Sequence, residues 1–368
     1  MSEPTHEAPR TEPTARLRPV LDRIVSYKPG GPVRSPDGRS YPLASNESPY
    51  EPPPAVVKAI GAAALGVHRY PDDAATELIA EIARHLGVAE DAVAVGCGSV
   101  GICQMLLEAV AEPGAEVLYA WRSFEAYPLL TALSGATSVQ IPLRDGVHDL
   151  AAMADALTER TRLVFVCNPN NPTGTAVHRA ELASFLDRVP ADCLVVLDEA
   201  YREYVRDERV PDGLTLLAGR PNVLVLRTFS KAYGLAGLRV GYAVGDPALI
   251  AGVRKAHLPF SVNSVALAAA LAALGSEAEL MARVESTVQE RGRVRAALIE
   301  QGYSVPAGEA NFLWLELGDR SAAFAAACAA AGVAVRAFAG DGVRVSIGSP
   351  TENDAFLTAA AAFTGRHG

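Results

Sequence analysis

The sequence has few features that would suit a metal site, a membrane span or a polyanionic partner. Its five cysteines contain no Cys-x-x-Cys pair and no zinc-type spacing, so we expect buried free thiols in a reducing compartment. The longest wholly apolar run, 265–274, falls well short of the roughly 20 residues that a membrane-spanning helix needs, and no apolar secretory segment follows Met1. The 42 acidic residues outnumber the 33 basic ones, which disfavours nucleic acid and anionic membranes as partners. We therefore expect a soluble, cytoplasmic protein without a bound metal.

The composition supplies ample apolar material for a large core. Of the 368 residues, 49% are hydrophobic and 20% are charged, which is enough for two domains. Between about residues 92 and 243, short runs that are apolar on both faces alternate with amphipathic helical stretches. This pattern is typical of an α/β protein with a mostly parallel sheet covered by helices, in which ligands bind at the carboxyl ends of the strands. The expected strands are 92–95, 116–119, 163–166, 194–197, 223–226 and 239–243.

The last third of the chain predicts a smaller α+β domain. An Ala-rich helix at 265–274 and a long charged helix at 276–301 precede three expected strands, at 311–315, 333–336 and 343–347. We expect the final helix to open with a capping box formed by Thr351 and Asp354. The predicted division is a disordered tail at 1–19, an arm at 20–44 that associates with the small domain, a large domain at 45–260 and a small domain at 261–368.

A lysine loop follows the expected strand 223–226. It holds Thr228, Ser230 and Lys231 and, eight positions after the lysine, Arg239. Hydroxyl and guanidinium groups bind a phosphate, and a lysine amine forms a Schiff base with an aldehyde. Both are needed to bind pyridoxal phosphate (PLP), so the loop predicts a covalent PLP site at Lys231.

Two further strand ends supply groups that PLP chemistry needs. Asp198 ends the strand 194–197, where a carboxylate held against the pyridine nitrogen of PLP keeps that nitrogen protonated; a helix-capping acid is the alternative. Asn171, in a loop that two prolines stiffen, is placed to meet the phenolic oxygen, and Tyr201 is a second donor to it. Asn-Pro and Pro-Thr-Gly are also common turn formers, so a purely structural loop is the alternative there.

The glycine-rich turn 95–101 links a strand to a helix. Glycine lets the backbone approach an anion closely, and the first free amides of a helix bind phosphate, so we expect Gly98, Ser99 and the amide of Val100 at a phosphate. The turn is neither a Walker loop nor a full G-x-G-x-x-G fingerprint. In the aromatic stretch 121–127 we choose Phe124 to stack on the pyridine ring, with core packing as the alternative.

The motifs at 168–174, 198–201 and 230–239, in that order and spacing, resemble the fold-type I PLP-dependent aminotransferases, specifically the histidinol-phosphate aminotransferase group with its aromatic amino acid aminotransferase branch. The resemblance covers about residues 17–363. It implies a large domain with a mostly parallel seven-stranded sheet and a smaller α+β domain. It also implies that Lys231 is the catalytic residue, which shuttles a proton between the Cα of the substrate and the C4′ of the cofactor. The implied cofactor-binding residues are Gly98, Ser99, Val100, Phe124, Asn171, Asp198, Tyr201, Thr228, Ser230, Lys231, Arg239 and Tyr70, and the implied substrate-binding residues are Tyr27, Asn46, Asn171, Arg336 and Arg344.

The resemblance extends to assembly and substrate. Tyr70 matches the family tyrosine that reaches the phosphate in the neighbouring subunit, which implies a homodimer. Arg344 matches the arginine that clamps a substrate carboxylate or phosphate, and Arg336 and Tyr27 match residues that close over the substrate. The implied reaction is a ping-pong transamination between an amino acid and a 2-oxo acid such as 2-oxoglutarate.

Two departures from the histidinol-phosphate pattern favour phenylalanine and tyrosine as substrates. Ala44 and Ser48 stand where the histidinol-phosphate enzymes commonly have asparagine, and the stretch 121–127 is closer to the aromatic branch. The alternatives are a histidinol-phosphate aminotransferase of histidine biosynthesis, a PLP decarboxylase acting on phosphothreonine, and a non-catalytic sensor module. We would expect such a sensor to be fused to a DNA-binding domain, and the segment 1–19 is too short to form one.

Overall fold

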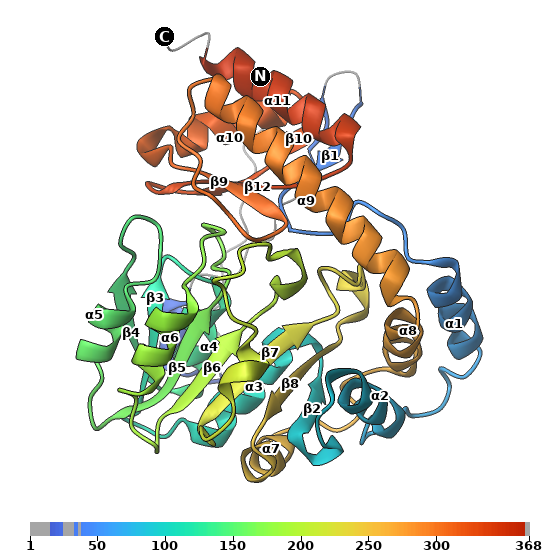
Figure 1. Cartoon of the computed structure of the whole chain (residues 1–368), viewed down its shortest axis with the longest axis vertical. Coiled ribbons are helices and arrows are strands. Elements are labelled where there is room, and N and C mark those ends of the chain that lie inside the picture. The colour runs from blue at the N-terminus through green and yellow to red at the C-terminus, as the bar shows by residue number, and fades with distance from the viewer. Residues whose placement is uncertain (1–14, 25–32, 36–37, 365–368) are drawn as a thin grey trace.

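The computed structural model describes residues 15–24, 33–35 and 38–364. A seven-stranded sheet forms the centre of the larger part of the molecule, in the order β2-β8-β7-β6-β5-β3-β4 (Figure 1). β8 runs antiparallel to both of its neighbours, and the other pairs are parallel. The predicted mostly parallel sheet is therefore confirmed. Its strands are β2 (Val93–Gly96), β3 (Glu116–Trp121), β4 (Thr137–Pro142), β5 (Thr161–Cys167), β6 (Leu194–Asp198), β7 (Val223–Thr228) and β8 (Gly241–Gly245).

Helices cover both faces of this sheet, which explains why its central strands are apolar on both sides. In β5, Leu163 and Phe165 pack with one helical layer, while Val164 and Val166 pack with the other, because successive side chains of a strand point to opposite faces. The first layer contains α3 (Gly98–Val110), α4 (Ala126–Ser134) and α7 (Pro247–Arg254), and the second contains α5 (Leu150–Asp155) and α6 (Arg179–Leu186). The burial of alternate side chains on both faces fixes the register of the strands.

Two strand predictions need correction. β4 was not expected, because it is the edge strand of the sheet and none of its residues is buried, so its sequence is not apolar on both faces. The strand expected at 239–243 begins at Gly241, since Arg239 adopts a left-handed backbone conformation with φ of 58° that interrupts the strand.

The smaller domain consists of short sheets and three helices. β9 (Phe312–Leu315), β11 (Arg336–Phe338) and β12 (Gly342–Ser346) form an antiparallel sheet in the order β11-β12-β9, and β10 (Val333–Ala334) pairs in parallel with β1 (Tyr41–Pro42). The single strand predicted at 333–336 is therefore wrong: the chain turns at Val335 and passes from one sheet to the other. The covering helices are α9 (Glu277–Glu300), α10 (Ser321–Ala330) and α11 (Pro350–Thr364).

The cap of α11 lies two residues earlier than predicted. Glu352 accepts a hydrogen bond from the Ser349 amide at 2.7 Å, and the Glu352 amide donates to the Ser349 hydroxyl at 3.4 Å. Ser349 and Glu352, and not Thr351 and Asp354, form the capping box. The physical reason is Pro350, which lacks an amide hydrogen and is favoured in the first helical turn, so that the residue before it becomes the cap.

The long helix α9 connects the two hydrophobic cores. In Figure 1 it runs from the region of α1 (Pro54–Ala64) and α8 (Ser264–Leu274) to the small domain. Leu280 and Val284 pack in the large-domain core that includes α1, α8 and α2 (Thr76–Leu86), whereas Val294 and Leu298 pack in the small-domain core. The predicted boundary at 260 stays a prediction, and this packing favours a later transition, along α9.

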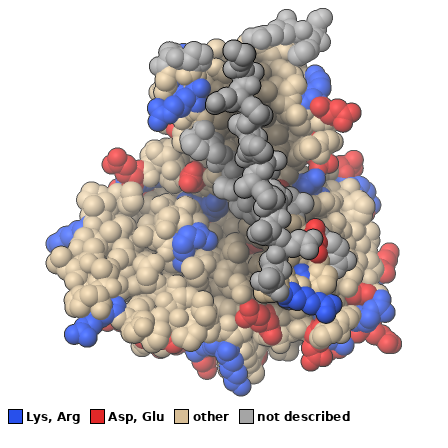
Figure 2. Space-filling model, turned by 180° about the vertical axis from the view of Figure 1, so that it is seen from behind, with Lys and Arg blue, Asp and Glu red and all other residues tan. Residues whose placement is uncertain are grey.

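Part of the predicted arm pairs with the small domain through β1, as the pairing with β10 shows. Tyr27 and most of the predicted tail lie outside the described residues. Lys and Arg are interspersed with Asp and Glu over the face in Figure 2. Within the described residues, no single helix is long and apolar enough to cross a membrane; the bent pair α8 and α9 passes the same test by length and composition, across an angle of 82°.

Candidate active site

A cavity of about 430 Å³ lies where the carboxyl ends of β5, β6 and β7 face the small domain. The last residues of these strands, Cys167, Asp198 and Thr228, line it together with Arg344 of β12. The cavity brings together most of the residues that the sequence predicts for one site: Asn46, Ser99, Val100, Phe124, Asn171, Asp198, Tyr201, Thr228, Ser230, Lys231, Arg239 and Arg344. Its other lining residues were not predicted: Ser45, Glu47, Ala126, Leu129, Cys167, Ala200 and Ala236.

Lys231 has the electrostatic surroundings of a reactive amine. Its Nζ donates a hydrogen bond to the Ser45 carbonyl at 3.1 Å. Burial, and then the positive charge of Arg344, lower the pKa of Lys231 to about 7, because both disfavour the charged form. Near neutral pH much of this amine is therefore unprotonated, as a nucleophile or a general base requires.

Asp198 offers one carboxylate oxygen to a ligand. Tyr127 donates its hydroxyl hydrogen to Oδ2 at 2.6 Å, while the buried Oδ1 has no hydrogen-bond partner among the described residues. Burial raises the pKa of Asp198 to about 6. A buried polar atom without a partner costs free energy, so a ligand N–H that reaches Oδ1 would be strongly favoured. A protonated pyridine nitrogen is such a donor, and this end of the cavity fits PLP.

Another part of the cavity lining fits a phosphate. Ser99 and Val100 lie in the first turn of α3, and no side chain in the described part of the chain caps this helix. Arg239 donates to the Ser230 hydroxyl at 3.3 Å. Free helix amides, hydroxyls and a guanidinium together are a typical phosphate site.

Gly98 does not line the cavity, but it leaves the space that Arg239 occupies next to the start of α3. It has φ of 70°, and a Cβ at this position would lie 2.6 Å from Nη2 of Arg239. Glycine is therefore required for Arg239 to approach the start of α3. The structure places Gly98 outside the residues that line the cavity, although it was predicted among the cofactor-binding residues.

The small domain and the arm meet the large domain at Arg344. Its Nη1 donates to the Asn171 side-chain oxygen at 2.5 Å, and its Nη2 donates to the Ala44 carbonyl at 2.7 Å. Asn46, with φ of 55°, donates from Nδ2 to the Tyr201 hydroxyl at 3.0 Å. These bonds hold a guanidinium, an amide and a phenol around one region of the cavity.

Besides Gly98, two of the described residues predicted for the site, Tyr70 and Arg336, do not line the cavity. Tyr70 is 82% exposed and stacks on Phe260, with ring centroids 4.5 Å apart. Arg336 lies outside the cavity lining and donates to Glu125 at 2.8 Å. Tyr27 cannot be placed, because it lies outside the described residues.

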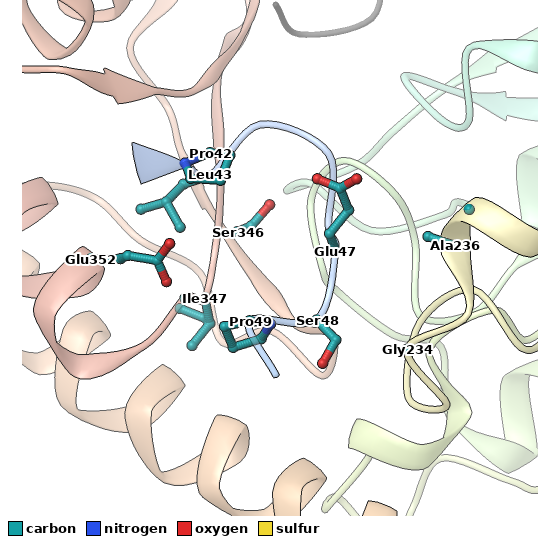
Figure 3. A pocket seen from close by; sticks show the side chains of 12 residues that line it. Pro42, Leu43, Glu47, Ser48, Pro49, Gly234, Ala236, Ser346, Ile347 and Glu352 are labelled. Atoms are coloured by element: carbon teal, nitrogen blue, oxygen red, sulfur yellow. The ribbon is translucent and has the colours of Figure 1, made fainter. Parts of the chain in front are cut away.

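A second cavity of about 270 Å³ adjoins the first and shares Glu47 and Ala236 with it. Figure 3 shows it between Glu352 on one side and the loop of Gly234 and Ala236 on the other, beside the segment that carries Glu47. Glu352 is already engaged in the cap of α11.

The comparisons with known proteins agree with this geometry. Residues 40–359 match the family described as "Aminotransferase class I and II". The chain belongs to this family. The prediction of a PLP-dependent aminotransferase of fold type I is thereby confirmed, and the predicted seven-stranded α/β fold with it.

Several curated relatives are similar over nearly the whole chain. An aromatic amino acid aminotransferase of Thermobifida fusca (strain YX) is 63% identical over 351 residues, which cover 95% of this chain and 98% of the relative. An enzyme of the same name from Streptomyces coelicolor is 58% identical, with 94% and 97% covered. Among solved structures, a histidinol-phosphate aminotransferase of Sinorhizobium meliloti in complex with pyridoxal-5'-phosphate has a TM-score of 0.87 at 27% identity, with 97% and 99% covered.

Tyr127 is a functional candidate that the sequence analysis missed. Its ring stacks on Phe165 at a centroid distance of 4.3 Å, and this packing fixes the direction of its hydroxyl group toward Asp198. The local sequence indicates only an aromatic residue in a helix at this position. Its hydrogen-bond partner, Asp198, is 71 positions away, so no local pattern connects the two residues.

Tyr127→Phe is expected to weaken the binding of PLP about tenfold or more, because a hydrogen bond to a charged group contributes about 1.5–3 kcal/mol. The Tyr127 bond lowers the pKa of Asp198 against the effect of burial, so its loss favours the neutral carboxyl group that holds a pyridinium poorly. Titration of the cofactor-free variant with PLP measures the change. Thr131→Val, a substitution in the same helix, is the control; an unchanged affinity in Tyr127→Phe would contradict the assignment.

Proposed function

We propose that this chain transaminates aromatic amino acids, phenylalanine and tyrosine, with a 2-oxo acid such as 2-oxoglutarate as amino acceptor and PLP as cofactor. The observation that carries the proposal is the 430 Å³ cavity, in which an amine of lowered pKa and a buried carboxylate with a free oxygen line one space. Phe124, Ala126 and Leu129 add apolar surface suited to an aromatic side chain. Relatives that are 54–63% identical carry the name aromatic amino acid aminotransferase.

The residues would divide the work as follows. When bound, PLP supplies a ring that accepts the electron pair released from the Cα–H bond of the substrate. The Lys231 amine takes up the Cα proton and returns it, for which a pKa of about 7 is well matched to neutral pH. Asp198 would keep the proton on the ring nitrogen, and Arg344, which donates to Asn171, would bind the α-carboxylate of the substrate. Asn46 lines the same cavity.

The remaining residues of the cavity would hold the cofactor in place. Phe124 would stack on its ring, and Asn171 and Tyr201 would meet its phenolic oxygen; all three line the cavity. The hydroxyls and amides at the start of α3 and in the lysine loop, namely those of Ser99, Val100, Thr228 and Ser230, would hold the phosphate together with Arg239.

A comparison of amino donors on one enzyme preparation tests the substrate. We expect kcat/KM for phenylalanine and tyrosine to exceed that for histidinol phosphate by about tenfold or more, since a pocket that matches an apolar group discriminates on this scale. The second candidate substrate is histidinol phosphate, because the solved structure with a TM-score of 0.87 carries that name. A large preference for histidinol phosphate would reverse the proposal, and release of carbon dioxide without a keto acid product would indicate a decarboxylase.

We also propose that the active unit is a homodimer. Tyr70 does not line its own cavity and stacks on Phe260. The large apolar side chains close to these two in the sequence, Leu65, Val67 and Leu258, are also exposed. Large apolar side chains that gather at a surface are typical of an interface. A second copy related by twofold symmetry would cover them and place Tyr70 beside the phosphate end of the neighbouring cavity.

Mixed dimers of two inactive variants test this arrangement. Lys231→Ala and Tyr70→Ala are each expected to be severely impaired. After unfolding and refolding in a one-to-one mixture, random pairing predicts recovery of about a quarter of the wild-type activity, because one site in each mixed dimer has both residues intact. No recovery in dimers isolated as mixed, by a different affinity tag on each variant, would contradict a shared site.

A further inference from the structure

Two ion pairs connect the loop after β3 to the small domain. Arg336 Nη2 lies 2.8 Å from Glu125 Oε2, and Arg122 Nη2 lies 2.6 Å from Asp341 Oδ2. Each pair joins residues more than 200 positions apart in the sequence. The Glu125–Arg336 pair is the less exposed one, with side chains 29% and 19% exposed, so solvent screens it less.

The Glu125–Arg336 pair lies at the rim of the active-site cavity. Glu125 stands between Phe124 and Ala126, both of which line the cavity. On the other side, Arg336 is the direct cross-strand partner of the lining residue Arg344, so both guanidinium groups project from the same face of the small sheet. The ring of Phe338 lies within 6 Å of both, at 5.7 Å from Arg336 and 5.9 Å from Arg344.

We infer that Glu125 is a built-in anion that occupies Arg336 and thereby selects against substrates with a second anionic group, such as a distal carboxylate. This inference rests on the proposed function and specifies its substrate class. An aromatic side chain can enter while the ion pair stays closed. A distal anion must instead displace Glu125 from Arg336 and then remain near the displaced carboxylate, which costs a charge-assisted hydrogen bond and adds like-charge repulsion.

The same competition applies to the amino acceptor. A dicarboxylic oxo acid such as 2-oxoglutarate uses Arg344 for its α-carboxylate and competes with Glu125 for Arg336. It should therefore bind weakly relative to an aromatic oxo acid. Glu125 is a positioning residue in this scheme, because it acts on the substrate through Arg336.

The test is Glu125→Gln in the holoenzyme, which keeps the shape of the side chain and removes its charge. We expect KM for 2-oxoglutarate to fall about tenfold, so that kcat/KM for this substrate rises about tenfold relative to phenylalanine. The conservative Glu125→Asp retains the charge and should retain most of the discrimination. Arg336→Ala combined with Glu125→Gln should cancel the gain.

Asp341→Asn is the matched control, since it breaks the neighbouring connection between the domains without touching Arg336. The deciding quantity is kcat/KM for 2-oxoglutarate divided by kcat/KM for phenylalanine. The inference would be overturned if Glu125→Gln changed this ratio by less than about twofold, or if Asp341→Asn changed it equally. Each variant is compared with the wild type on the same substrate, so the result does not depend on which substrate the wild type prefers. A wild type that prefers histidinol phosphate contradicts the proposed function alone.

Discussion

Lys231→Ala is expected to lower kcat for the transamination of phenylalanine by at least about 10³-fold, because the variant loses both its nucleophile and its general base. The reason lies in the surroundings of the amine: burial lowers the pKa of Lys231 to about 7, which prepares it for proton transfer near neutral pH. Turnover with phenylalanine and 2-oxoglutarate measures the loss. The visible absorbance of the cofactor bound to protein, which depends on its bond to the lysine, should change in parallel.

Two controls separate the role of the amine from its charge and from the general effect of losing a lysine. Lys231→Arg retains a cation but not a reactive amine, and it should not restore turnover. Lys255→Ala removes an exposed lysine from the end of α7 and should leave the rate unchanged. Substantial turnover by Lys231→Ala would refute the assignment of the catalytic residue.

Asp198→Asn is expected to reduce kcat about 10²–10³-fold, comparable to the loss of one preorganised electrostatic contact in other enzymes. An asparagine at this position cannot hold a proton on the ring nitrogen, whereas the free Oδ1 of Asp198 can accept a hydrogen bond from it. Since Tyr127 still donates to the remaining side-chain oxygen, the fold around residue 198 should be retained.

Cofactor affinity and catalysis must be measured separately for this variant. Saturating PLP, with occupancy determined after removal of unbound cofactor, ensures that the rate refers to loaded enzyme. A kcat within about threefold of the wild type at full occupancy would show that Asp198 contributes to binding but not to the chemical step.

The centre of the site was accessible from the sequence because β5, β6 and β7 are buried on both faces. Because these strands are apolar on both faces, the sequence shows where each one ends. Parallel strands bring their carboxyl ends to one edge of the sheet. Asn171, Asp198 and Lys231 follow these ends and meet in one cavity, as predicted. The edge strand β4 is not apolar on both faces, and the short run at 333–336 gave no indication that the chain changes sheets at Val335.

Contacts between distant segments were beyond the reach of sequence patterns. The bond from Tyr127 to Asp198 joins α4 to the end of β6, and the Glu125–Arg336 pair crosses from one domain to the other. Such pairs depend on how elements pack, which periodicity and motifs do not encode. The roles of individual residues, the dimer, the domain limits and the location in the cytoplasm stay predictions.

The lowered pKa of Lys231 also has a consequence for chemical labelling. The chain contains four lysines among its 33 basic residues. At pH 8 a lysine with an ordinary pKa of about 10.4 is less than about 1% neutral, whereas an amine with a pKa of about 7 is about nine-tenths neutral. A small acylating reagent that enters the cavity of the cofactor-free protein should therefore modify Lys231 before the other lysines, so that the fraction labelled at position 231, measured by mass spectrometry, reports the fraction of sites without cofactor.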